Sequence, residues 1–197
     1  MFTMNNLWSE ATKSLLAGNL AVLPTDTIYG LVGKATTREA IEKLDHAKQR
    51  PPTSPYIILI GSLADLEIFD IILTEDTKRI LDKIWPGRVS VVLPTPSENF
   101  SYLKHGHQNL AFRYPADQNL TGLIKNTGPL AAPSANPHGK PPATTIEEAQ
   151  AYFGSKVDVY VRAHTEPLAG QPSTLLDLTE PKPQLLRPGA LDVSPYL

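Results

Sequence analysis

The chain has 197 residues, of which 41% are hydrophobic and 19% charged, and its formal net charge at pH 7 is −2. This composition excludes a disordered chain, and the balance of charges excludes a global positive field that would attract nucleic acid to the whole surface. There is no cysteine, which excludes disulfides, a thiolate nucleophile and cysteine-ligated zinc and fits a cytoplasmic location. No apolar stretch is long enough to span a bilayer. We therefore expect a single domain over residues 1–197 and no membrane partner.

The N-terminal segment, residues 1–18, has apolar residues at helical spacing and lacks the basic and apolar regions of a signal peptide. We expect a helix with Leu7, Ala11, Leu15 and Leu16 on one face. A short apolar run over 20–23 then predicts a strand.

Two capping boxes predict helix starts. Thr36 and Glu39 predict a helix that begins at Thr36 and ends near Gln49, because the next residue precedes a proline. Thr145 and Glu148 predict a second such start. Further helices are expected over 63–69, 77–84 and 120–125, and further strands over 56–60, 89–93, 110–112, 130–132, 157–161, 174–178 and 184–186. This alternation predicts an α/β fold with one mixed, twisted sheet.

The stretch from residue 23 to residue 31 places polar groups directly after a predicted strand. Pro24 should end this strand, because proline cannot donate to a sheet, and Gly30 permits a sharp change of direction. Ligands of open α/β sheets bind at such strand ends. The groups presented there are Thr25, Asp26, Thr27 and Tyr29. A turn whose hydroxyls are satisfied internally is the alternative interpretation.

Two other loops also combine polar groups with proline. Lys48 and Arg50, at a predicted helix end, suit a polyanion such as a triphosphate, and cations that complement the helix dipole are the alternative. Ser134 and Asn136 lie in a Pro-Ser-Ala-Asn turn, which offers hydroxyl, amide and N–H groups to an anion or forms an ordinary turn.

Two arginines also lie where a polar group meets a proline-containing loop. Arg113 and Arg187 each come at the end of a predicted strand, just before a turn that contains proline. The repeated arrangement indicates an anion or nucleotide site. The chain nevertheless contains neither a Gly-x-Gly-x-x-Gly fingerprint nor a Walker A lysine.

Taken together and in order, these motifs resemble those of the YrdC/TsaC family over about residues 8–190. The motifs are Pro24-Thr25-Asp26-Thr27-Ile28-Tyr29-Gly30-Leu31, Lys48-Gln49-Arg50-Pro51, Trp85-Pro86-Gly87, Pro133-Ser134-Ala135-Asn136, Pro142-Ala143-Thr144 and Leu186-Arg187-Pro188-Gly189. The resemblance implies a YrdC-like twisted mixed sheet flanked by helices, with a concave, positively charged face. It also implies the short, single-domain form of the family.

The activity implied by the resemblance is that of an L-threonylcarbamoyladenylate synthase, a nucleotidyltransferase. Such an enzyme makes threonylcarbamoyl-AMP and pyrophosphate from L-threonine, bicarbonate and ATP, with Mg²⁺ accompanying the ATP, for the t6A modification of tRNA. A carbamate attacks the α-phosphorus, so no side-chain nucleophile is required, and catalysis comes from orientation and charge stabilisation. Expected partners are t6A transferase proteins and tRNA or double-stranded RNA.

The resemblance also implies the role of each candidate residue. ATP-binding residues are Arg50, Ser54, Asn109, Ser134, Asn136 and Arg187. Threonine-binding residues are Thr27, Arg113, Ala132 and Ser173. Lys48 and Arg50 are assigned to catalysis beside the phosphates, and Arg113 suits a bidentate grip on the threonine carboxylate.

The sequence departs from the family pattern at several positions. Leu59 replaces a histidine found near the threonine in many members, and Pro142 replaces a common serine. Asn109 stands for Thr or Ser, and Arg88 stands where proline is frequent. The resemblance leaves two alternative interpretations to consider. A YciO-like paralogue that binds RNA or nucleotide without synthase activity is the alternative. Hydrogenase-maturation carbamoyltransferases carry cysteine zinc fingers, which this chain lacks.

Overall fold

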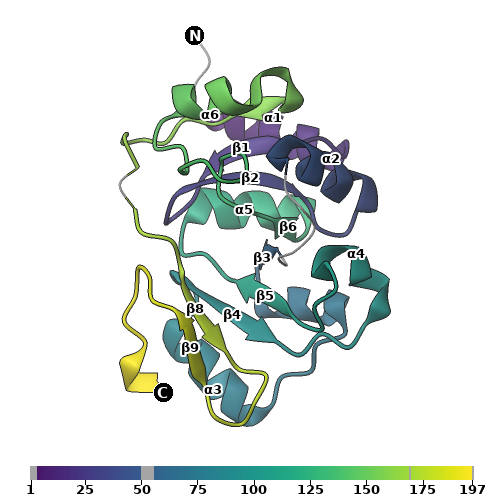
Figure 1. The fold of residues 1–197 in the computed structure, drawn as a ribbon, viewed down its shortest axis with the longest axis vertical. Coiled ribbons are helices and arrows are strands. Elements are labelled where there is room, and N and C mark those ends of the chain that lie inside the picture. The colour runs from purple at the N-terminus through teal and green to yellow at the C-terminus, as the bar shows by residue number, and fades with distance from the viewer. Residues whose placement is uncertain (1–3, 50–55, 169, 197) are drawn as a thin grey trace.

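The computed structural model describes residues 4–49, 56–168 and 170–196. Within these ranges, nine strands form one sheet in the order β7-β1-β2-β6-β3-β5-β4-β8-β9 (Figure 1). The strands are β1 (Ala21–Pro24), β2 (Tyr29–Lys34), β3 (Ile57–Leu59), β4 (Val89–Leu93), β5 (Leu110–Arg113), β6 (Leu130–Ala131), β7 (Val159–Tyr160), β8 (Thr174–Asp177) and β9 (Gln184–Arg187).

The sheet is mixed, as the sequence predicts. The pairs β1–β7, β3–β5 and β4–β8 are parallel, and the other five pairs, from β1–β2 to β8–β9, are antiparallel. Parallel neighbours need crossover connections, and here these run through helices, which places helices on the faces of the sheet.

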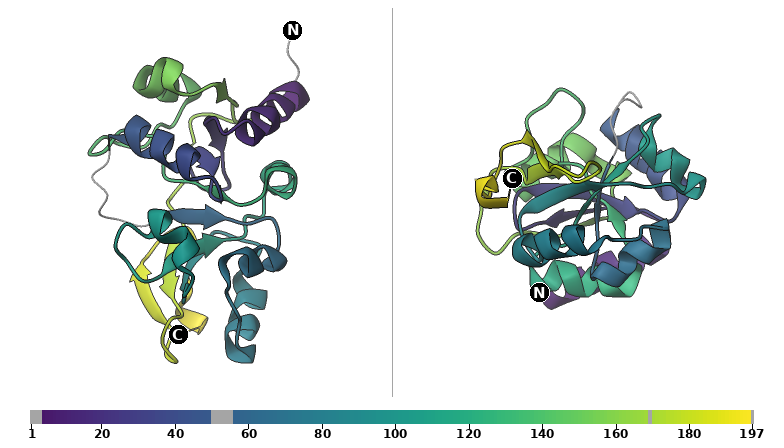
Figure 2. Two further views of the ribbon diagram at one scale, coloured as in Figure 1. Left: turned by 90° about the vertical axis from the view of Figure 1, so that its right-hand side faces the viewer. Right: turned by 90° about the horizontal axis from the view of Figure 1, so that it is seen from below.

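The helices cover both faces of the sheet. They are α1 (Met4–Leu16), α2 (Arg38–Lys48), α3 (Glu75–Ile84), α4 (Ser101–Lys104), α5 (Gln118–Thr127) and α6 (Ile146–Phe153), with short 3₁₀ helices η1 (Leu63–Phe69), η2 (Glu98–Phe100), η3 (Gly154–Lys156) and η4 (Ser194–Tyr196). In the left view of Figure 2, α1 and α5 lie on one side of the sheet and α2 on the other. None of the helices in the described ranges is long and apolar enough to cross a membrane.

The buried apolar residues form two clusters, one on each face. Leu31 and Ile58 belong to the cluster with α2, whereas their neighbours Val32 and Leu59 belong to the cluster with α1 and α5. Side chains alternate across a strand, so β2 and β3 each contribute to both clusters. All four side chains are fully buried, and burying one such side chain is worth about 1.5–3 kcal/mol.

One of the two predicted capping boxes is wrong. The N-cap of α2 is Thr37, and its side chain makes no capping hydrogen bond, so the helix begins one residue later than the Thr36–Glu39 pattern predicts. For α6 the predicted N-cap is correct, because Thr145 Oγ1 accepts a hydrogen bond from Glu148 N. In a capping box the glutamate side chain also accepts a hydrogen bond from the N-cap backbone N–H. Here the Glu148 carboxylate accepts from Thr144 N instead of Thr145 N.

The face predicted for α1 is correct in part. Ala11 and Leu15 are fully buried, but Leu16 is 53% exposed. Leu16 follows Ala11 by five residues, which is about 140° around a helix, so the two cannot share a narrow face.

Strand β2 was missed by the sequence analysis, because two glycines in Tyr-Gly-Leu-Val-Gly-Lys weaken its β pattern. Gly33 has a packing reason. A Cβ there would lie 3.0 Å from Leu20 Cδ2 and 3.3 Å from Ala40 O. Glycine therefore lets α2 approach β2 closely.

Candidate functional site

A cleft of about 360 Å³ collects most of the residues that the sequence singled out. Its lining comes from the β1–β2 loop, the end of α2, the end of β5, the loop after β6, the residues before β8 and the end of β9. The predicted site residues that line it are Thr27, Lys48, Arg113, Ala132, Ser134, Asn136, Ser173 and Arg187. Segments far apart in the sequence therefore meet at one place.

The backbone joins the Pro24–Leu31 motif to the Pro-Ser-Ala-Asn turn. Gly30 and Ser134 form an isolated antiparallel bridge. On either side of it, Leu31 N donates to Pro133 O at 2.9 Å and Ala135 N donates to Tyr29 O at 2.9 Å. The Pro-Ser-Ala-Asn turn is thus held against the start of β2, which fixes its polar groups relative to the β1–β2 loop.

The β1–β2 loop folds around the Thr25 hydroxyl. Thr25 Oγ1 donates to Ile28 O at 2.7 Å and accepts from the backbone N–H groups of Thr27 and Ile28 at 3.2 and 3.3 Å. The internally satisfied turn is therefore the correct interpretation for Thr25. Thr27 is different, because its hydroxyl faces both Thr25 Oγ1 and the guanidinium of Arg113, each at 2.9 Å.

Arg113 is a buried cation of the cleft, with 5% of its surface exposed. Its Nη1 donates to Thr27 Oγ1, and its Nη2 lies 3.4 Å from Asp26 Oδ1. Burial lowers the pKa of Arg113, and the Asp26 carboxylate opposes that shift. Arg113 Nε is buried and has no hydrogen-bond partner among the described residues. A buried donor without a partner is costly, so this group suits an acceptor supplied by a ligand.

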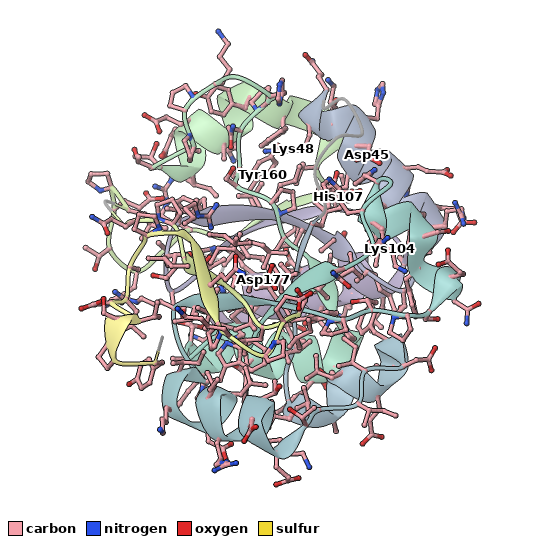
Figure 3. All side chains as sticks on the ribbon, turned by 60° about the horizontal axis from the view of Figure 1, so that its bottom comes forward. Asp45, Lys48, Lys104, His107, Tyr160 and Asp177 are labelled. Carbon is pink, nitrogen blue, oxygen red and sulfur yellow. The ribbon has the colours of Figure 1, made fainter. Side chains whose placement is uncertain are left out.

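Lys48 connects the end of α2 to the Pro-Ser-Ala-Asn turn (Figure 3). Its Nζ donates to Ser134 O at 2.6 Å and to Asn136 Oδ1 at 3.4 Å. The Asn136 amide in turn donates to Lys140 O at 2.7 Å. Lys48 is 4% exposed. These contacts therefore hold a positive charge at the cleft wall.

Arg187 reaches across from β9 to the residue before β8. Its Nη2 donates to Ser173 O at 2.8 Å and to Ser173 Oγ at 3.3 Å, and burial lowers its pKa. The glycine that follows in the Arg-Pro-Gly motif is required by a close approach, because a Cβ on Gly189 would lie 2.4 Å from Pro172 O. This contact fixes the C-terminal motif against the cleft.

Two contacts within the site carried no signal in the sequence. Gly170 crosses the β1–β2 loop so closely that a Cβ there would lie 1.7 Å from Thr27 O. Tyr29, a cleft residue, donates its hydroxyl to Glu166 and accepts from Ala163 N at 2.6 Å. Burial, together with the Glu166 hydrogen bond, raises the pKa of Tyr29. Both contacts join residues more than 130 positions apart, which spacing along the chain cannot reveal.

Three predicted positions remain. Arg50 and Ser54 lie outside the described residues. Asn109 lines a separate hollow, of which Lys104 and His107, labelled in Figure 3, are also part. The Oδ1 atom of Asn109 accepts from Thr95 N at 3.3 Å.

Two of the departures from the family pattern have different positions. Leu59 is fully buried in the apolar cluster with α1 and α5 and does not line the cleft. Pro142 does line the cleft. The first departure therefore adds to the core, and the second shapes the cleft wall.

A family comparison matches residues 13–189 of this chain to the Sua5/YciO/YrdC family, described as telomere recombination. The chain belongs to this family. A threonylcarbamoyl-AMP synthase of Pyrococcus abyssi is 36% identical over 175 residues, which is 88% of this chain and 51% of the relative. The chain thus spans about half the length of that relative.

Solved structures agree with the fold. The crystal structure of P. abyssi Sua5 complexed with L-threonine matches with a TM-score of 0.89 and 33% identity, covering all of this chain and 57% of that one. E. coli YciO matches with a TM-score of 0.84 and 23% identity, covering 99% of this chain and 94% of that one. At that identity, the second likeness concerns the fold alone.

Proposed function

We propose that this chain is a threonylcarbamoyl-AMP synthase, which forms threonylcarbamoyl-AMP and pyrophosphate from L-threonine, bicarbonate and ATP. The observation that carries the proposal is the cleft, where a buried arginine with an unused donor lies with two further cations, Lys48 and Arg187. The names of the relatives support it, as does the threonine-bound Sua5 structure.

The threonine end of the cleft is assigned to Arg113 and Thr27. A guanidinium offers a planar fork of donors that matches a carboxylate. Thr27 fixes one nitrogen of that fork at 2.9 Å and Asp26 lies beside another, so the fork is oriented before a ligand arrives. Ala132 and Ser173 complete this end of the proposed site.

The phosphate end is assigned to Lys48, Ser134, Asn136 and Arg187, and, outside the described residues, to Arg50 and Ser54. The amine of threonine and bicarbonate give a carbamate. A carbamate oxygen forms the bond to the α-phosphorus, and the bond between that phosphorus and the departing pyrophosphate breaks. The protein supplies no nucleophile, and its cations stabilise the negative charge on the transferring and leaving groups.

Asn109 lies apart from the other described members of the ATP set, because it lines the second hollow and not the cleft. We retain it as a proposed contact for a part of ATP that extends beyond the cleft.

Magnesium is proposed to arrive with ATP. No carboxylate lines the cleft among the described residues, and the same residues contain no group of three or more His, Cys, Asp or Glu side chains that could hold a metal ion. Mg²⁺ takes oxygen ligands and is commonly bound through substrate phosphates. Its ligands would here be triphosphate oxygens and water.

The proposed product must be consumed by a second reaction that transfers its threonylcarbamoyl group to an acceptor. An adenylate is an activated mixed anhydride, so proteins that transfer the threonylcarbamoyl group to tRNA would consume it. The t6A transferase proteins and tRNA are therefore proposed partners, and the cytoplasm is the proposed location. A YciO-like protein without synthase activity would share this fold, and the activity assay separates the two.

The test is an incubation of the protein with ATP, Mg²⁺, bicarbonate and L-threonine, with pyrophosphate and the adenylate both measured. Pyrophosphate should appear in step with the adenylate, and omission of threonine should abolish both. Omission of bicarbonate in a carbon dioxide-free buffer should also abolish both products. Release of ADP, or pyrophosphate release that is independent of threonine, would contradict the proposal.

A further inference from the structure

Ser90 lies behind the cleft wall, on a strand that pairs with β5 and β8 in the sheet. It belongs to β4, it is fully buried, and it does not line the cleft. Its hydroxyl has one hydrogen-bond partner among the described residues, which is Ser173 Oγ at 2.7 Å. Ser173 does line the cleft and is 3% exposed. The pair therefore connects a core hydroxyl to a cleft hydroxyl.

The direction of this hydrogen bond follows from the donors and acceptors present. A hydroxyl has one proton and two lone pairs, and an arginine can only donate. Arg187 Nη2 lies 3.3 Å from Ser173 Oγ, so Ser173 accepts there. If Ser173 also donated to Ser90, the buried Ser90 proton would have no acceptor, which is costly. Ser90 therefore donates to Ser173.

Ser173 then receives two hydrogen bonds, and its own proton remains for a ligand. We infer that Ser90 is a positioning residue, which turns the Ser173 hydroxyl so that it donates into the cleft to an oxygen of an anionic ligand. The inference rests on the proposed function for the identity of that ligand, the carboxylate of L-threonine. Ser90 acts only through Ser173 and contacts no substrate.

The backbone around the pair supports a fixed geometry. Ser90 pairs with Leu175 in the parallel β4–β8 ladder, and Thr174 N donates to Arg88 O at 3.1 Å. The two strands are thus in register up to the residue next to Ser173. The distance between the two hydroxyls is consequently set by the sheet and not by a mobile loop.

The experiment compares the wild type with Ser90→Ala by calorimetric titration, with L-threonine and with ATP in separate runs. Loss of the donated hydrogen bond should weaken threonine binding roughly 3- to 10-fold, the range for one neutral hydrogen bond. ATP binding should change less than threonine binding. Thr127→Val is the matched control, since it also deletes a buried hydroxyl, one that donates within α5 and does not line the cleft.

A double-mutant cycle with Ser173→Ala separates positioning from a general effect on the fold. If Ser90 acts through Ser173, Ser90→Ala should cause no further loss of threonine affinity in the Ser173→Ala background. Should Ser90→Ala fail to fold, Ser90→Cys is measured in its place, because a thiol keeps a side chain of similar shape and is a weak donor.

An unchanged affinity for threonine in Ser90→Ala would overturn the inference. Equal losses for both ligands, or additive losses in the cycle, would overturn it too. A wild-type protein that binds no threonine would refute the proposed function and the inference with it, whereas the other outcomes leave the proposed function in place.

Discussion

Replacement of Arg113 by lysine tests the proposed threonine site most directly, because it keeps the charge and removes the fork. The guanidinium uses Nη1 for Thr27 and Nη2 for Asp26, and leaves Nε for a ligand. A lysine ammonium is a single point charge on a flexible stem. It cannot contact Thr27, Asp26 and a carboxylate with the same geometry.

The expected loss follows from one missing charge-assisted hydrogen bond, which is worth roughly 1.5–3 kcal/mol, or about 10- to 150-fold in affinity. Arg113→Lys should therefore weaken threonine binding by about that factor and ATP binding much less. The free energy of unfolding should fall less than in Arg113→Ala. In the alanine variant the Asp26 carboxylate, whose side chain is 8% exposed, loses its cation, and such a loss costs about 3–5 kcal/mol.

Calorimetric titration of each ligand, with urea unfolding of each variant, decides the matter. Equal losses for threonine and ATP would mean that Arg113 serves the phosphates or the fold. No loss for either ligand would place Arg113 outside the site.

Three other predictions test the surroundings of the cleft. Gly170→Ala should weaken threonine binding at least tenfold, because its Cβ would collide with Thr27 O. Gly122→Ala lies in open space within α5 and should instead stabilise the protein by about 0.5–1 kcal/mol. Calorimetric titration and urea unfolding measure both variants. Tyr29→Phe should make the decline of stability above pH 10 shallower by up to about 1.4 kcal/mol per pH unit. The pKa of Tyr29 is raised in the folded protein, so its contribution to the free energy of unfolding is complete below the unfolded-state pKa of about 10 and is lost as the pH rises above that value. If the variant and the wild type lose stability with the same slope in urea titrations at pH 9–11, this prediction is contradicted. Arg50→Ala should lower the rate of pyrophosphate release tenfold or more with little change in urea midpoint, and an unfolded mutant whose folded fraction retains normal activity would refute that role.

The strands and helices were predictable where the apolar pattern was regular. The segment 89–93 was predicted as a strand and is β4. Strand β2 was not predictable because Gly30 and Gly33 interrupt its pattern, and Gly33 serves a close packing that only the folded chain contains. The start of α2 was misplaced because Thr36 and Thr37 both fit an N-cap, and local pattern cannot choose between adjacent threonines.

The residues of the site were predictable as types and through the order of motifs, but their contacts were not. Pattern alone indicated an anion site, and the resemblance supplied the roles of Thr27 and Arg113. The hydrogen bond between these two residues spans 86 positions. Gly170 and Glu166 had no motif around them, and their importance arises from a chain crossing that no local preference encodes.

The way the cations are held bears on what the cleft can bind. Lys48 donates to a carbonyl and an amide oxygen, and Arg187 donates to the carbonyl and hydroxyl of Ser173. These acceptors are neutral, so they orient the cations without cancelling their charge. Arg113 has a carboxylate beside it, Asp26, which reduces the net charge there while the unused Nε remains a donor. The polyanion should therefore be bound by Lys48 and Arg187, and the singly charged carboxylate by the unused donor of Arg113. The charges of ATP and threonine would in this way distribute the two substrates among these cations.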